Sequence, residues 1–201
     1  KLDIYEYIVF VLVFFLFTVT ALLITPFVRL YTRGIVDTEY NQPLFGFLLV
    51  LSEALYLVKL PHLNLAYSAN KFKEITVPAY IEAMLNIVIS VALVKKLGLI
   101  GVTIGTIVGM TYRMVFHVYY TSKIVPGRAQ RIFYRKLFLF AVGAGAGFAL
   151  CYKLLPLQNV TVGSWIVHAI FYCVVIGSIL LAISVLFFQN EMKFFAKYIK
   201  R

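Results

Sequence analysis

Two basic residues in an otherwise apolar stretch are the side chains most able to do chemistry. Arg113 and His117 continue, at i+4 spacing, a stripe of three glycines on one helical face. These glycines are Gly101, Gly105 and Gly109. A cation at membrane depth is costly and by default marks a functional site, where it can bind an anionic group. The alternative is that both side chains extend to the headgroups, since Tyr119 and Tyr120 place an interface close by.

A second set of charged residues precedes this stretch. Glu53 and Lys59 lie roughly 120° apart around a helix, so they are poorly placed to pair with each other. Each therefore needs a partner on another helix or a water-filled cavity, and we interpret Glu53 as facing a cavity. Pro61 removes a backbone hydrogen bond near Lys59 and could open the helix locally. The alternative for Lys59 is a position at the cytoplasmic end of its span.

A polar stripe follows in the next span. Glu82, Asn86 and Ser90 recur at i+4, and such a stripe faces protein or water instead of lipid. Packing between helices is the first interpretation for Asn86, and a place in a substrate cavity is the second. Glu82 is interpreted as lying near the cytoplasmic interface.

These residues do not form a catalytic constellation. The sequence has no nucleophile beside a base, no HExxH, no carboxylates at metal-ligand spacing and no P-loop. We therefore predict a protein that is not an enzyme and uses no metal or cofactor. An enzyme acting within the membrane through Glu53, Glu82 and His117 stays open, without positive support.

The elements that must position these side chains are membrane-spanning helices. The 201 residues are 62% hydrophobic, with a mean hydropathy of +0.92. Apolar runs of roughly twenty residues recur along the whole chain, which predicts an all-α, polytopic membrane protein. Strict apolar/polar alternation, which a membrane barrel needs, is absent. The six predicted spans are residues 5–30, 43–67, 78–94, 99–120, 137–155 and 165–188.

The basic residues indicate the orientation. The formal charge is +11, but no nucleic-acid-binding motif is present, so nucleic acid is not an expected partner. Most of the 19 Lys and Arg fall in the gaps on the N-terminal side of the membrane, which predicts that both ends are cytoplasmic. Residues 125–136 are expected to form a separate basic helix on the headgroups, with Arg128, Arg131 and Arg135 on one face. The C-terminal tail is expected to anchor similarly.

Four stretches together resemble the C-terminal half of the oligosaccharide flippases, the Wzx-like polysaccharide transporters of the MATE-like (MOP) superfamily. The four stretches are residues 25–37 (TPFVRLYTRGIVD), 67–74 (YSANKFKE), 81–90 (IEAMLNIVIS) and 98–106 (GLIGVTIGT). Tyr40 and Pro43 follow the first of them. In the second, Asn70 stands where the family often has Gly, and this is a mild departure because Asn tolerates the left-handed conformation.

The resemblance implies a two-lobed transporter that moves an undecaprenyl-pyrophosphate-linked oligosaccharide outward by alternating access. Residues 1–124 would be four helices of the second lobe, residues 125–136 a basic linker, and residues 137–201 an extra helix pair with a basic tail. An N-terminal lobe of the same chain would then be missing. The setting would be the cytoplasmic membrane of a bacterium or archaeon, with membrane lipid around the chain and H⁺ or Na⁺ as a coupling ion.

In that frame, the candidate residues of the substrate cavity are Arg113, His117, Glu53, Lys59 and Asn86. A pyrophosphate crossing an apolar layer must be desolvated, and Arg113, with His117 or Lys59, would offset that cost. The charge count places Arg113 in the inner half of the membrane. A multidrug or cation antiporter of the same superfamily, using Glu53, is the alternative. A membrane-embedded enzyme of envelope assembly and an accessory subunit also stay open.

Overall fold

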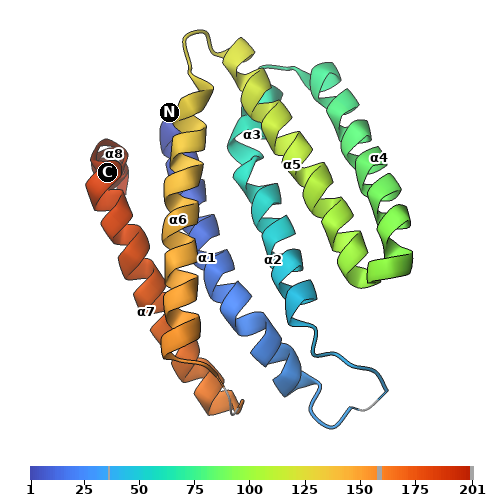
Figure 1. Ribbon diagram of the computed structural model, residues 1–201. Helices are drawn as coiled ribbons and strands as arrows, with labels where there is room; N and C mark the ends of the chain where they lie inside the picture. The colour runs from blue at the N-terminus through green and yellow to red at the C-terminus, as the bar shows by residue number, and fades with distance from the viewer. Residues whose placement is uncertain (36, 158–159, 200–201) are drawn as a thin grey trace. The chain divides into compact units, whose positions relative to one another are not determined.

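The computed structural model describes residues 1–35, 37–157 and 160–199, and of residues 195–199 the backbone alone. The described residues form helices and no strand, so the prediction of an all-α, polytopic membrane protein is confirmed. Within the described residues, six spans are long and apolar enough to cross a membrane. Helices α2 and α3 share one of these spans (Figure 1). The helices are α1 (Leu2–Tyr31), α2 (Pro43–Val58), α3 (Leu60–Ser68), α4 (Phe72–Leu97), α5 (Leu99–Ile124), α6 (Gln130–Leu154), α7 (Val162–Phe187) and α8 (Gln189–Ile199).

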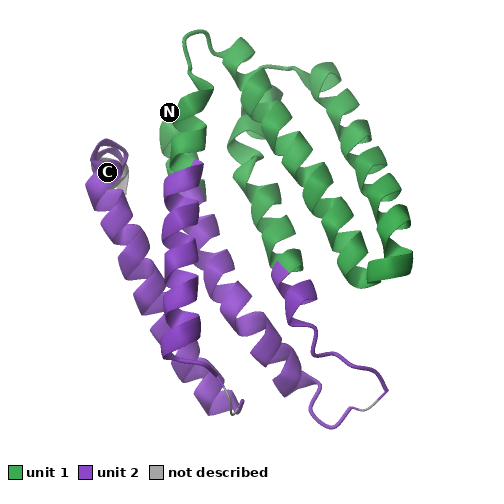
Figure 2. Cartoon of the chain, in the orientation of Figure 1, with its two compact units in different colours: residues 1–9, 48–136 green, residues 10–47, 137–201 purple. Residues whose placement is uncertain are grey.

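The chain divides into two compact units, drawn in two colours in Figure 2. Unit 1 holds residues 1–9 and 48–136, and unit 2 holds residues 10–47 and 137–201. Helices α1, α2 and α6 each contribute to both units. The units therefore do not follow the chain order of the three parts expected from the sequence.

The hairpin of α4 and α5 is the main body of unit 1. A single residue, Gly98, joins the two helices at φ 55°, a conformation that favours glycine. The expected close approach of the glycine stripe is confirmed. A Cβ on Gly101 would lie 2.7 Å from the carbonyl carbon of Leu93, and one on Gly105 would lie 2.8 Å from the carbonyl oxygen of Asn86. Because no side chain stands between them, the backbones of α4 and α5 touch along this stripe.

The connection between α3 and α4 turns on Asn70. Its φ is 54°, a left-handed conformation that asparagine tolerates better than most residues. Below this turn a small apolar core of Leu63, Ala66 and Ile75 holds α3 and α4 together, with Tyr120 of α5 packed against it. This core fixes the end of α3 next to α5, which decides where the charged side chains of the two helices lie.

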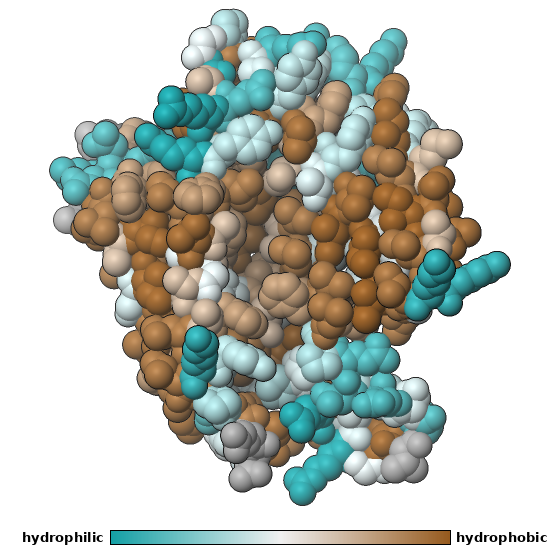
Figure 3. All heavy atoms as spheres, in the orientation of Figure 1, coloured by the Kyte–Doolittle hydropathy of each residue, from teal (hydrophilic) through white to brown (hydrophobic). Residues whose placement is uncertain are grey.

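Unit 2 is held by aromatic and glycine contacts. The ring of Phe140 on α6 lies edge-on to Phe10 of α1 at 6.1 Å and stacks on Phe188 at 5.3 Å. The predicted small-residue face of α6 is confirmed at Gly143 and Gly147, which both face side chains of α7. In Figure 3 apolar residues cover the sides of the helices, and hydrophilic residues gather at helix ends and connections.

The separate interfacial helix expected at residues 125–136 is not formed. Residues 125–129 make a turn around Gly127, at φ 82°, and from Gln130 the chain is already the first turns of α6. Arg131 and Arg135 are exposed there, whereas Arg128 precedes the helix and is only 9% exposed. The physical reason is that Arg128 is held by carboxylates of α1 instead of lipid headgroups. Lys200 and Arg201 of the basic tail lie outside the described residues.

Candidate functional site

Four charged or titratable side chains meet inside unit 1, and we call them the central cluster: Lys59, Glu82, Arg113 and His117. Glu82 accepts from both cations, with Oε1 3.2 Å from Lys59 Nζ and Oε2 paired with Arg113 Nη1. Arg113 Nε in turn donates to His117 Nε2 at 3.2 Å. The cluster therefore joins three membrane-spanning segments through one carboxylate.

The local structure explains why these groups meet. Pro61 stands at the start of α3, and the break that it imposes leaves Lys59 between α2 and α3, where its side chain is 1% exposed. The break expected from the sequence is thus confirmed. Glu82 lies on α4 opposite Gly109, where an added Cβ would be 3.0 Å from the Glu82 carbonyl oxygen. The glycine stripe brings α4 close enough for Glu82 to reach Arg113, one turn further along α5.

The cluster lies well away from the ends of α4 and α5. Glu82 lies about 15 Å along α4 from Phe72, at 1.5 Å per residue, in a helix of 26 residues. Arg113 is similarly distant from the end of α5 at Ile124. The helix begins at Phe72, six residues before the predicted start of its span at Pro78, so Glu82 is farther from the helix end than the sequence predicts. Glu82, the centre of the cluster, was left out of the predicted site.

His117 is held as a neutral imidazole. Its Nε2 accepts from Arg113, so Nδ1 carries the ring proton. Nδ1 is buried and has no hydrogen-bond partner within the described part of the chain. The ring therefore orients the guanidinium of Arg113 and adds a buried N–H donor beside it.

The charges of the cluster do not balance. Two basic side chains, Lys59 and Arg113, share the single carboxylate of Glu82. The accessible member of the pair is Arg113, whose side chain is 15% exposed, whereas that of Lys59 is 1% exposed. The arrangement can present a guanidinium to an anion while Lys59 keeps Glu82 in place.

The other two predicted site residues lie apart from this cluster. Asn86 is one turn from Glu82 on α4, and its Oδ1 accepts from Ser90 Oγ at 3.0 Å and Thr106 Oγ1 at 3.5 Å. These contacts match its interpretation as a packing residue between helices. Glu53 is exposed on α2 and forms no hydrogen bond or ion pair with any described residue, although its charge attracts that of Lys59.

Sequence reasoning missed a second polar group in unit 1, which we call the Glu6 cluster: Asp3, Glu6, His62, Arg128 and Lys136. Glu6 is fully buried, and its Oε1 lies 2.8 Å from His62 Nε2 and 2.6 Å from Arg128 Nη2. Lys136 Nζ, also fully buried, lies 3.3 Å from Glu6 Oε2 and donates to the carbonyl oxygen of Asp3 at 2.9 Å. The first turn of α1 is thereby fixed to α3 and to the start of α6.

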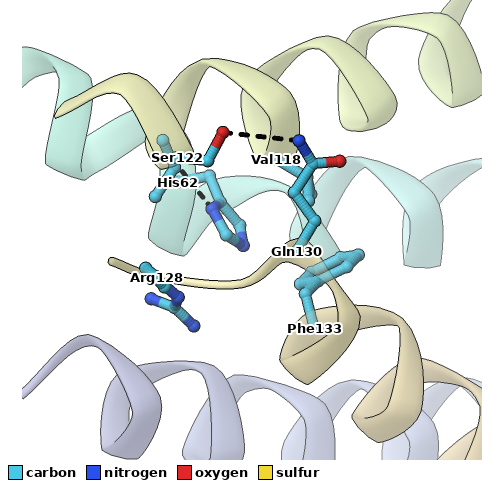
Figure 4. Close-up of a pocket in the computed structure, with 7 residues that line it drawn as sticks. His62, Val118, Ser122, Arg128, Gln130 and Phe133 are labelled. Atoms are coloured by element: carbon cyan, nitrogen blue, oxygen red, sulfur yellow. Dashed lines mark hydrogen bonds between the residues drawn. The ribbon is translucent and has the colours of Figure 1, made fainter. Parts of the chain in front are cut away.

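His62 connects this cluster to α5. Its Nδ1 lies 2.8 Å from Thr121 Oγ1, and its ring meets Phe133 edge-on at 4.8 Å. Figure 4 shows His62, Arg128 and Phe133 around a small pocket, with Gln130 donating to Ser122 across it at 3.3 Å. These side chains fill the pocket closely, so the Glu6 cluster packs α1, α3, α5 and the start of α6 together.

One sequence signal could have found the Glu6 cluster. The chain has 8 Asp and Glu but 19 Lys and Arg. A carboxylate near a span is therefore expected to form an ion pair with one of the more numerous cations. Asp3 and Glu6 enter the first span on the same side of the membrane as the basic residues 128–136. That shared side predicts pairing between them in place of simple headgroup anchoring.

Among the described residues no group of three or more His, Cys, Asp and Glu is placed to hold a metal ion. Comparison of the chain with known protein families, curated proteins and solved structures found no match.

Proposed function

We propose that this chain serves in a flippase that moves a lipid-linked oligosaccharide, carried on undecaprenyl pyrophosphate, across a bacterial or archaeal cytoplasmic membrane. The observation that carries the proposal is the central cluster, in which Lys59 and Arg113 share one carboxylate near the middle of α4 and α5. Ionisable residues within membrane spans mark substrate or ion pathways by default, and the cationic excess favours an anionic substrate.

Arg113 is the residue that would bind the pyrophosphate. Its guanidinium has five N–H donors, and Glu82 and His117 use two of them, at Nη1 and Nε. The remaining donors of this partly exposed side chain can take phosphate oxygens, in the paired geometry that arginine favours. An incoming anion would compete with Glu82 for Arg113. While the anion is bound, Lys59 would keep its ion pair with Glu82.

Release of the substrate follows from the same competition. Glu82 is tethered by Lys59 at 3.2 Å, so it stays within reach of Arg113 while the anion is bound. When the site opens to the other side of the membrane, Glu82 can replace the pyrophosphate on Arg113. The carboxylate thus keeps the site from holding the anion too tightly, as alternating access requires.

Replacement of Arg113 tests the proposal in the natural full-length protein. The variants Arg113→Gln and Arg113→Lys are expressed in cells whose own flippase for the glycan is deleted, and export of the glycan is measured. We expect loss of export for Arg113→Gln, and at least about tenfold slower export for Arg113→Lys, which lacks the paired donors. The control is Arg131→Gln, an exposed cation at the start of α6. Normal export by Arg113→Gln at unchanged protein level refutes the proposal.

A second candidate function is that of a multidrug or cation antiporter of the same superfamily. The exposed carboxylate of Glu53 favours it, because a carboxylate on a span with no ion-pair partner among the described residues can exchange H⁺ or Na⁺ for a cationic substrate. Glu53→Gln separates the two functions. Loss of resistance to cationic compounds with glycan export retained supports the antiporter, whereas the flippase requires export to depend on Arg113.

A further inference from the structure

Unit 2 contains a cavity of about 640 Å³ that is unrelated to the central cluster. It lies where α1 and α6 end and where α2 begins, with α7 behind it. Its volume is in the range of sites that bind small molecules or cofactors. The cavity is therefore large enough for a substantial part of an amphiphile.

The wall of the cavity is apolar and aromatic. The ring of Phe47 on α2 meets Phe148 of α6 at 5.8 Å, and Phe148 stacks on Tyr152 at 6.1 Å with the planes 7° apart. Behind them Tyr172 is 3% exposed and donates its hydroxyl to the carbonyl oxygen of Leu155 at 2.7 Å. Since that hydroxyl is engaged, Tyr172 presents its ring to the cavity, and the wall as a whole suits hydrocarbon.

The mouth of the cavity is polar and cationic. Arg29, in the last turn of α1, and Asn41, just before α2, both line it and both are exposed. Neither side chain forms a hydrogen bond or an ion pair with another described residue. Two free donors therefore stand at the helix ends, at the level where lipid headgroups lie.

The lining determines which amphiphile fits. Arg29 is its one charged residue, and the described lining contains no Asp or Glu that could pair with a cationic headgroup. Arg29 repels the ammonium of a zwitterionic headgroup, whereas an anionic headgroup accepts hydrogen bonds from both Arg29 and Asn41. A free phosphate would leave the aromatic wall uncovered. We propose that this cavity binds an anionic phospholipid of the bilayer, with its headgroup on Arg29 and Asn41 and its acyl chain along Phe47 and Phe148.

Native mass spectrometry of the detergent-solubilised full chain tests the site with two probes, phosphatidylglycerol and phosphatidylcholine. We expect phosphatidylglycerol to bind at least about tenfold more tightly, and Arg29→Gln to remove that preference. Arg33→Gln is the matched control, since Arg33 is exposed four residues further on and does not line the cavity. Ala21→Phe, which fills the cavity from α1, is expected to reduce binding of both lipids.

Four results would overturn the proposal. If the two lipids bind equally, or if the preference for phosphatidylglycerol remains in Arg29→Gln, Arg29 does not bind the headgroup. Stronger binding of undecaprenyl phosphate than of phosphatidylglycerol assigns the cavity to the carrier lipid instead. Full displacement of the lipid by inorganic phosphate assigns it to a free anion. Thermal unfolding of each variant is measured as a control. A variant that unfolds cooperatively is folded, so a loss of lipid binding is then due to the change in the cavity.

Discussion

Removal of the Glu82 carboxylate should be among the most destabilising single changes in unit 1. In Glu82→Gln the buried Lys59, 1% exposed, loses the carboxylate 3.2 Å away, and Arg113 loses its partner as well. Breaking a buried ion pair by removing one partner costs roughly 3–5 kcal/mol, because the remaining charge is uncompensated. Arg113, at 15% exposed, can turn toward water, so we expect a loss in the lower half of that range.

The assay is reversible unfolding of the detergent-solubilised protein, followed by helical circular dichroism. The matched control on the same helix is Glu74→Gln, whose partner Lys71 lies 3.3 Å away in an exposed pair, and we expect no measurable change from it. Lys59→Met combined with Glu82→Gln should recover part of the loss, because the buried charge and its partner are then both absent. If Glu82→Gln is as mild as Glu74→Gln, Lys59 has another partner and the central cluster does not hold the helices together.

Three further changes have expected outcomes of their own. Glu6→Gln should destabilise unit 1 by roughly 3–5 kcal/mol in the same unfolding assay, because it leaves two or more buried cations without their carboxylate. Gly105→Ala places a Cβ 2.8 Å from the Asn86 carbonyl oxygen and should cost about 1–3 kcal/mol, whereas Gly145→Ala meets open space and should be neutral or slightly stabilising. Thr161→Ala removes a capping box from α7 and should lower the unfolding free energy by about 1 kcal/mol.

Helix positions and their packing stripes could be predicted from the sequence. The length of an apolar run and the thickness of a bilayer determine the spans with little ambiguity, and i+4 spacing identified both the glycine stripe and the stripe of Glu82, Asn86 and Ser90. The structure shows that these two stripes face each other: Gly105 meets Asn86 and Ser90, and Gly109 meets Glu82. Periodicity alone identifies a face but not the helix that covers it.

The candidate site was predicted only in part, for two physical reasons. The sequence predicts that this span begins at Pro78, yet α4 begins at Phe72 and continues through this proline, so Glu82 lies farther from the helix end than predicted. The Glu6 cluster joins residues more than fifty positions apart, as in the contact between Glu6 and His62. No local pattern encodes such pairing, and only the shortage of carboxylates indicates it.

The i+4 stripe on α5, from Gly101 to Thr121, has two halves with different physical roles. The ion pair between Arg113 and Glu82 depends on both halves. From Gly101 to Gly109 the absence of side chains brings α4 into backbone contact, which a cation on this face would prevent. From Arg113 onward the same face carries polar side chains, and these bind partners on neighbouring segments: Arg113 binds Glu82, and Thr121 binds His62. A shift of α5 along its axis would therefore disturb the central cluster and the Glu6 cluster together. In the proposed transporter, the binding of an anion to Arg113 would then be transmitted to the first turn of α1 through one rigid helix.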